Sequence, residues 1–169
     1  NNHEKSFADL QLVTNTFTDK LTKESDGRKL GEIIELVNNR NSSHEYDSSL
    51  RGVSRNKVFI DTVATSTDLD LSKYKIIKKD EFVFSGMQTG RDKCIRVALN
   101  STDPIIVSPA YSVFRIQNGI QILPEFLMMY LQRPESDRLG WYKSDSSVRS
   151  NLDWDRFCEF TVPIPPITV

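Results

Sequence analysis

Residues 81–116 read EFVFSGMQTGRDKCIRVALNSTDPIIVSPAYSVFRI, and this stretch decides the fold class that we predict. Apolar runs rich in β-branched and aromatic side chains alternate here with short polar breaks. Such alternation is typical of antiparallel strands that are joined by turns. The runs at 82–84, 94–97, 105–107 and 111–114 therefore predict one compact antiparallel sheet.

The sequence on either side of this stretch extends the same fold. Residues 30–37 predict one or two helical turns that run into a strand, and 58–60 and 74–77 predict two further strands. Beyond residue 116 the pattern becomes helical, and Pro124 and Pro134 stand where a first-turn proline loses no hydrogen bond. We therefore predict an α/β fold of the α+β kind: a small, twisted, mostly antiparallel sheet with short C-terminal helices.

Length and composition fit a single domain. The chain has 169 residues, of which 38% are hydrophobic and 27% charged, as is ordinary for a globular protein. We expect residues 1–27 to be a lead-in segment, helical or poorly ordered, and residues 28–169 to form the domain. Cys94 and Cys158 are expected to be buried thiols in a reducing compartment. No run approaches the roughly 20 apolar residues of a membrane span, so we expect a cytoplasmic protein.

The placement of charge is more informative than the net charge of −1. Residues 28–60 hold six cations and four acids, and residues 83–119 hold four cations and two acids. In residues 120–160 the balance reverses to seven acids and five cations. These counts predict a dipolar protein with one cationic face.

Enzyme motifs are incomplete in this sequence. The segment GMQTGR at 86–91 has one residue too few between its glycines for a phosphate-binding P-loop and lacks the Lys-Ser/Thr that should follow. The segment SPAY at 108–111 is similar to the catalytic tetrapeptide of amino-methyltransferases but lacks its second proline, and a turn is the favoured interpretation. His3 and His44 have no nucleophile or metal ligand at suitable spacing. We predict no catalytic residue, no cofactor and no metal site.

Three polar loops, at 38–57, 85–93 and 144–151, are better candidates for function. Arg can make bidentate contacts to guanine, Gln and Asn can pair with adenine, and Lys, Ser and Thr hold phosphates. The three loops together supply all of these side chains. Solvated surface loops have the same composition, so composition alone favours neither interpretation.

Five blocks of the sequence resemble one known family. They are RGVSRNKVFIDT at 51–62, KYKIIKKDEFVFSGMQTGRDKCIRVAL at 73–99, IIVSPAYSVFRI at 105–116, LPEFLMMYLQRPESDR at 123–138 and SVRSNLDWDRFCEFTVPIPPI at 147–167. In this order they are similar to the target recognition domain of type I restriction-modification specificity (S) subunits. The resemblance covers about residues 28–169.

The resemblance implies a host-defence protein that binds double-stranded DNA sequence-specifically and reads one half of a bipartite target. The chain would perform no chemistry; methylation would belong to partner methyltransferase (M) subunits, and cleavage to restriction (R) subunits bound through them. Family members carry two recognition domains and spacer helices. This chain has one domain and no spacer, so we expect an excised domain or fragment that is monomeric or weakly self-associating. The alternative is a docking module for a methyltransferase subunit without DNA readout of its own.

Base contacts vary with the target in this family, so individual residues transfer only as candidates. Which of them read bases and which hold phosphates stays open. The predicted DNA-binding residues are Arg40, Arg51, Arg55, Lys57, Gln88, Thr89, Arg91, Lys93, Ser146, Ser147, Arg149 and Asn151.

Overall fold

The computed structural model describes residues 27–62, 69–145 and 150–164, together with four residues of the lead-in segment. These four are helical and exposed; they are Leu12, Val13, Thr16 and Lys20. The prediction for the rest of residues 1–26 lies outside the described residues.

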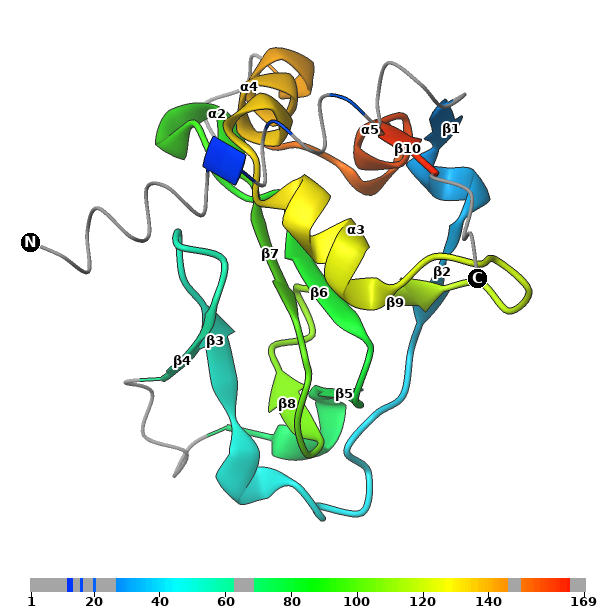
Figure 1. Cartoon of the computed structure of the whole chain (residues 1–169). Coiled ribbons are helices and arrows are strands. Elements are labelled where there is room, and N and C mark those ends of the chain that lie inside the picture. The colour runs from blue at the N-terminus through cyan, green and yellow to red at the C-terminus, as the bar shows by residue number, and fades with distance from the viewer. Residues whose placement is uncertain are drawn as a thin grey trace, which may run out of the picture.

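A four-stranded antiparallel sheet forms the centre of the domain (Figure 1). Its strands are β2 (Ile34–Val37), β9 (Ser112–Ile116), β6 (Phe82–Ser85) and β7 (Arg96–Leu99), in this order across the sheet. Three of the four come from the stretch at 81–116, so the predicted antiparallel sheet is confirmed.

Three two-stranded antiparallel sheets accompany the central one. They pair β1 (Gly27–Lys29) with β10 (Thr161–Pro163), β3 (Arg51–Val53) with β4 (Phe59–Asp61), and β5 (Lys75–Ile77) with β8 (Ile105–Val107). The prediction that 105–107 belongs to the same sheet as its neighbours in sequence was therefore wrong. Strands β7 and β9 occupy both edges of β6, and β8 pairs with β5 instead. The segment at 108–111 is a turn, in which Tyr111 N–H donates to the Ser108 carbonyl over 3.1 Å.

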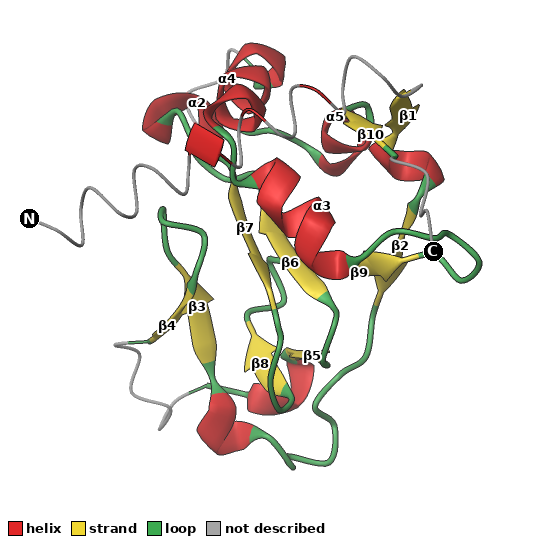
Figure 2. Ribbon diagram, in the orientation of Figure 1, coloured by secondary structure: helices red, strands yellow, loops and turns green. Residues whose placement is uncertain are grey.

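Most of the helices follow the sheet in sequence, and Figure 2 draws them in red. They are α3 (Pro124–Leu131), α4 (Pro134–Lys143) and α5 (Trp154–Cys158), and the first two begin at the prolines that predicted them. The four-residue α2 (Thr89–Asp92) lies between β6 and β7. Single turns of 3₁₀-helix complete the described elements at Leu30–Glu32, Asp47–Ser49 and Leu71–Lys73.

One face of the central sheet packs against the helices. Phe82 stacks on Phe114 with ring centroids 4.9 Å apart, and Phe84 stacks on Phe157 of α5 at 4.0 Å. Leu127 of α3 closes the same cluster, and all five side chains are buried. Aromatic pairs of this kind add to the free energy of burying their surface, so the α5 segment is held firmly against β6.

The opposite face of the sheet packs against the smaller sheets. Val83, Ala98 and Val113 point to this side, where they meet Val53 of β3 and Val107 of β8. Because β6 is covered on both faces, it is buried along its whole length. Burial on both faces explains why its sequence, FVFS, is a nearly continuous apolar run rather than an alternating one.

The two cysteines depart from expectation. Cys94 and Cys158 are free thiols as predicted, but each is partly exposed rather than buried. Cys94 lies just before β7, at the edge of the sheet, and Cys158 ends α5 beside Gly31.

The end of β6 makes a close backbone contact with the segment before α5. Leu152 N–H donates to the Gly86 carbonyl over 2.9 Å, and Gly90 N–H donates to the Ser150 carbonyl over 2.9 Å. A Cβ atom on Gly86 would lie 1.6 Å from the Leu152 carbonyl oxygen, so no other residue fits there without moving the backbone.

We expect Gly86→Ala to lower the free energy of unfolding by about 3 kcal/mol, because the methyl group pushes the 150–152 segment away from β6. Denaturant titration followed by tryptophan fluorescence measures this change. Gly52→Ala is the matched control, because a Cβ there meets its neighbours at 3.6 Å, an ordinary contact. Equal midpoints for the two variants would contradict the prediction.

Candidate nucleic-acid interface

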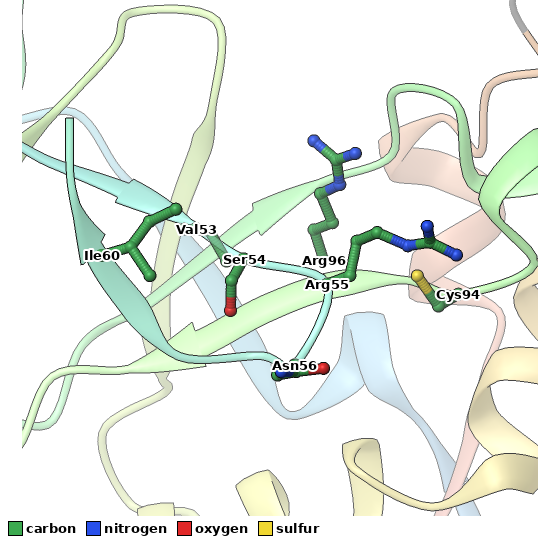
Figure 3. Close-up of a pocket in the computed structure, with 7 residues that line it drawn as sticks. All are labelled: Val53, Ser54, Arg55, Asn56, Ile60, Cys94 and Arg96. Atoms are coloured by element: carbon green, nitrogen blue, oxygen red, sulfur yellow. The ribbon is translucent and has the colours of Figure 1, made fainter. Parts of the chain in front are cut away.

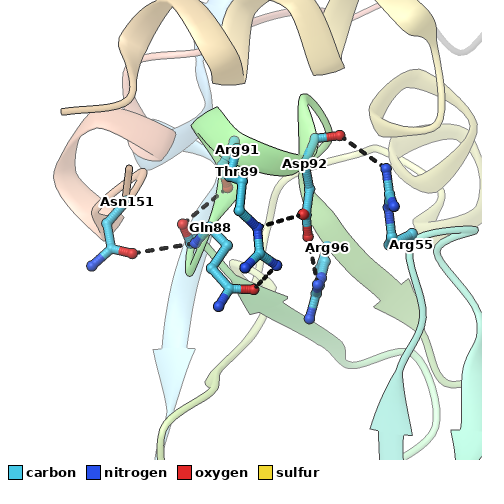
Figure 4. Close-up of polar contacts among 8 residues, drawn as sticks. Arg55, Gln88, Thr89, Arg91, Asp92, Arg96 and Asn151 are labelled. Carbon is cyan, nitrogen blue, oxygen red and sulfur yellow. Dashed lines mark hydrogen bonds and ion pairs between the residues drawn. The ribbon is translucent and has the colours of Figure 1, made fainter. Parts of the chain in front are cut away.

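Three segments that are distant in sequence meet beside the start of β7 (Figure 4). They are the hairpin loop at 54–58, residues 86–93 around α2, and residues 150–152. The hairpin reaches α2 through Arg55, whose Nη2 donates to the Asp92 carbonyl over 3.3 Å. The third segment reaches α2 through Asn151, whose Oδ1 accepts from Gln88 N–H over 3.3 Å.

Asp92 is the centre of this arrangement. Its Oδ1 lies 3.1 Å from Arg91 Nε, and its Oδ2 lies 2.6 Å from Arg96 Nη2. Arg55 bonds to its carbonyl oxygen, so guanidinium groups from the hairpin, α2 and β7 share one acceptor residue. We call Arg55, Arg91, Arg96 and Asp92 the arginine cluster; its formal charge is two positive units.

Asp92 is ionised within this cluster. Burial raises the pKa of its carboxyl, but hydrogen bonds from Arg96 and Arg91, together with their charges, outweigh burial and hold the pKa below its usual value. A carboxyl group whose pKa is lowered by folding stabilises the fold above its unfolded-state pKa, and the stabilisation is lost as pH falls through the folded-state value. The cluster is therefore fully formed at neutral pH.

Gln88 and Arg91 form a side-chain pair on the same surface. Arg91 Nη2 donates to Gln88 Oε1 over 2.5 Å. A guanidinium has only donors, so the amide must turn its oxygen toward Arg91 and keep its Nε2 group on the other side. The pair as a whole therefore offers hydrogen-bond donors, the amide NH₂ and the remaining guanidinium N–H groups, to a ligand.

Lys93 extends the cationic surface toward α4. Its Nζ lies 4.9 Å from the ring centroid of Trp141, a distance suited to a cation–π contact. Trp141 is half exposed and its neighbour Tyr142 is 85% exposed. An aromatic side chain that is half open to solvent thus lies against Lys93, and a second exposed one follows it on α4.

Two predicted contact residues are buried instead. Thr89 is fully buried, and its hydroxyl donates to the Gly86 carbonyl over 2.9 Å. Lys57 is 6% exposed; its Nζ donates to the Leu131 carbonyl over 2.9 Å and pairs with Asp137 Oδ1 at 2.8 Å. The prediction that these two residues contact DNA is corrected, because neither side chain reaches the surface.

Lys57 positions the hairpin rather than contacting a ligand. Asp137 Oδ1, its partner on α4, also accepts from Ile95 N–H over 3.0 Å. This ion pair therefore joins the hairpin loop, α4 and the residue just before β7. Because the ion pair holds the loop, Arg55, two residues before Lys57, lies against Asp92.

Two other predicted residues, Arg40 and Arg51, do not join the cluster. Arg40 donates to the Lys73 carbonyl over 2.6 Å, beside β5, and Arg51 lies 3.4 Å from Asp61 across the base of the β3–β4 hairpin, away from its tip. Ser146, Ser147 and Arg149 lie outside the described residues. Of the twelve candidates the structure brings together Arg55, Gln88, Arg91, Lys93 and Asn151.

The sequence reasoning missed Arg96 and Asp92. Arg96 was assigned only to a strand, and Asp92 was counted only as an acid that offsets the loop cations. One signal could have pointed to Arg96: a single cation interrupts the apolar run CIRVAL at 94–99 and lies on the same sheet face as Ala98. A charged side chain on a covered sheet face needs a partner, which Asp92 supplies four residues earlier.

Comparisons with known proteins leave the family open. No protein-family model matches the sequence, and no curated protein is significantly similar to it.

Within residues 27–62, 69–145 and 150–164, no group of His, Cys, Asp and Glu side chains could hold a metal ion. None of the helices described here is both long and apolar enough to cross a membrane.

We expect Lys57→Met to lower the free energy of unfolding by about 3–5 kcal/mol, because it leaves the Asp137 carboxylate without its cation. Thermal or denaturant unfolding measures the loss. Lys79→Met, at an exposed position, is the matched control and should unfold like the parent protein. A Lys57→Met protein as stable as the control would show that the ion pair does not hold the hairpin.

Proposed function

We propose that this domain binds double-stranded DNA sequence-specifically, as the cytoplasmic specificity component of a type I restriction-modification system. One observation carries the proposal: Arg55, Arg91 and Arg96 come from three elements and converge on one residue, Asp92, Arg91 and Arg96 at its carboxylate and Arg55 at its backbone carbonyl. With Lys93 they leave a local excess of three positive charges. The resemblance of the five sequence blocks to target recognition domains supports the same function.

The Gln88–Arg91 pair is suited to reading guanine. Guanine presents two acceptors, N7 and O6, in the major groove, whereas adenine presents one acceptor and one donor. Because Arg91 occupies the Gln88 carbonyl, the amide cannot make the bidentate contact to adenine that needs both of its ends. We therefore expect guanine at the position that this pair reads.

The few exposed cations of this surface predict weak binding by the isolated domain. Non-specific affinity grows with the number of phosphates that a protein neutralises, and the cluster with Lys93 can reach only a few. We expect a micromolar or weaker dissociation constant at physiological salt for the isolated domain, and a lower constant in the full system, where a second recognition domain adds avidity. Methylation and cleavage would be carried out by methyltransferase and restriction subunits, with no catalytic group from this chain.

A second candidate function is favoured by the exposed aromatic side chains of α4. Trp141 and Tyr142 present a surface of the kind that protein interfaces use as anchors. The domain would then dock onto a methyltransferase subunit without reading DNA itself.

Selection of randomised duplex DNA on the immobilised domain at low salt distinguishes the two functions. We expect sequencing of the bound pool to show enrichment of a short asymmetric motif that contains guanine. If DNA is retained but no motif is enriched, the surface contacts only the phosphates and does not read bases. A domain that retains no DNA but binds a methyltransferase subunit would establish the docking function instead.

With the selected duplex in hand, we expect Arg91→Ala to reduce discrimination for guanine at one position by about 1–3 kcal/mol. The substitution also frees the Gln88 carbonyl, so adenine should be accepted better at that position. Binding to a panel of single-base variants of the duplex, followed by fluorescence anisotropy, measures both effects. Arg115→Ala is the matched control, because Arg115 pairs with Glu35 on β2 rather than with the cluster.

Lys93→Ala should act differently, because we assign Lys93 to the phosphate backbone. We expect all sequences to be bound more weakly and the slope of log affinity against log salt to fall by about one. If Lys93→Ala instead weakened binding at one base position only, Lys93 would be assigned to a base. If Arg91→Ala weakened the binding of all sequences equally, Arg91 would be assigned to the phosphate backbone.

A further inference from the structure

An open hollow of about 670 Å³ lies between the tip of the β3–β4 hairpin and β7 (Figure 3). Its polar lining comes from Ser54, Arg55 and Asn56 of the hairpin and from Arg96 of β7. Val53, Ile60 and Cys94 complete the lining. No carboxylate is among the lining residues, so the two guanidinium groups give the hollow a positive character.

Both arginines are held in place from outside the hollow. Arg96 is fixed by its 2.6 Å contact with the Asp92 carboxylate, and Arg55 by its bond to the Asp92 carbonyl. Each guanidinium bonds to Asp92 through one Nη2 atom, so other N–H donors of the fork are left for a ligand. Arg96 Nε is buried and has no hydrogen-bond partner within the described structure. A buried donor without a partner costs free energy, which a bound acceptor would recover.

We propose that this hollow binds a phosphate group. Guanidinium groups pair with phosphate through charge-assisted and often bidentate hydrogen bonds, and two of them line this site. The Ser54 hydroxyl and Asn56 amide add neutral donors at the hairpin side. The apolar wall at Ile60, which is 47% exposed, suits the sugar to which such a phosphate is attached.

The expected source of the phosphate is the backbone of duplex DNA, and in this respect the inference rests on the proposed function. A phosphate contact carries no sequence information but fixes the register of the duplex on the protein. Because Asp92 holds Arg91 as well as Arg96 and Arg55, a phosphate in the hollow would set the distance from the backbone to the Gln88–Arg91 pair. A free phosphate or a mononucleotide offers the same chemistry and is the other possible source.

Alkylation of Cys94 provides a direct test, because this thiol lines the hollow. Cys158 will not interfere: burial, and to a lesser degree the charge of Asp155, raise its pKa to about 11. At pH 8 only about a thousandth of Cys158 is then thiolate, the form that reacts. Iodoacetamide labelling of the whole chain, followed by mass spectrometry of the peptides, reports the rate at Cys94 alone.

We measure the Cys94 rate in chloride, in inorganic phosphate at the same ionic strength, and with a duplex of random sequence at low salt. The duplex should slow alkylation about tenfold at ten times its dissociation constant, and phosphate should slow it in a saturable way. Arg96→Gln should abolish both protections. Arg55→Gln, at an exposed hairpin position, should weaken them and serves where Arg96→Gln affects folding.

The outcomes separate this inference from the proposed function. Protection by phosphate, with no duplex bound by anisotropy, supports the hollow as a site for free phosphate or a nucleotide and contradicts DNA binding. A duplex that binds by anisotropy but leaves Cys94 unprotected, or protects it equally in both arginine variants, overturns the phosphate site while DNA binding stands. Protection by neither, with no duplex bound, overturns both.

Discussion

The hydrogen bond from Leu152 N–H to the Gly86 carbonyl is the contact on which the candidate site depends. It forms at a separation that leaves no space for a side chain on Gly86, so the two backbones lie as close as they can. The contact brings Asn151 to Gln88 and Ser150 to Gly90, and so attaches the start of α2 to a segment some sixty residues away. A helix of four residues has little stability of its own, and this attachment is what keeps α2 in place.

The electrostatics of the site follow from the position of Asp92 within α2. Three arginines in one place repel each other, and a single aspartate cannot neutralise them. It can still hold them, because its two carboxylate oxygens accept from Arg91 and Arg96 and its backbone carbonyl accepts from Arg55. The result is a group of cations whose side chains are already ordered. Ordering side chains before binding removes part of the entropy that association costs. The excess charge is therefore available to a ligand at a smaller conformational cost than from mobile surface arginines.

The sheet and the helices could be read from local patterns, because alternation and proline placement act within a few residues. The strands β6, β7 and β9 and the starts of α3 and α4 were found in this way. The pairing of β8 with β5 could not be, since it depends on which edges of β6 are already occupied. Most of the site could not be predicted from such local patterns either, because it also depends on contacts between segments that are distant in sequence. Lys57 and Arg55 are both cations of the predicted loop at 38–57, and only the fold turns the first toward Asp137 and the second toward Asp92.

A net charge of −1 argues against nucleic-acid binding only if charge acts over the whole molecule. At physiological salt the screening length is about 8 Å. A ligand at the arginine cluster is therefore affected chiefly by charged groups that lie close to it, and only weakly by charges elsewhere on the protein. Acids outnumber cations by two in residues 1–27, by one in residues 61–82 and by two in residues 120–160. Several of these acids, such as Glu135 and Glu159, pair with Arg138 and Lys143. What matters for binding is the number of cations that remain unbalanced at one place. Around Asp92 that number is positive, and the donors left over there face a hollow without a carboxylate.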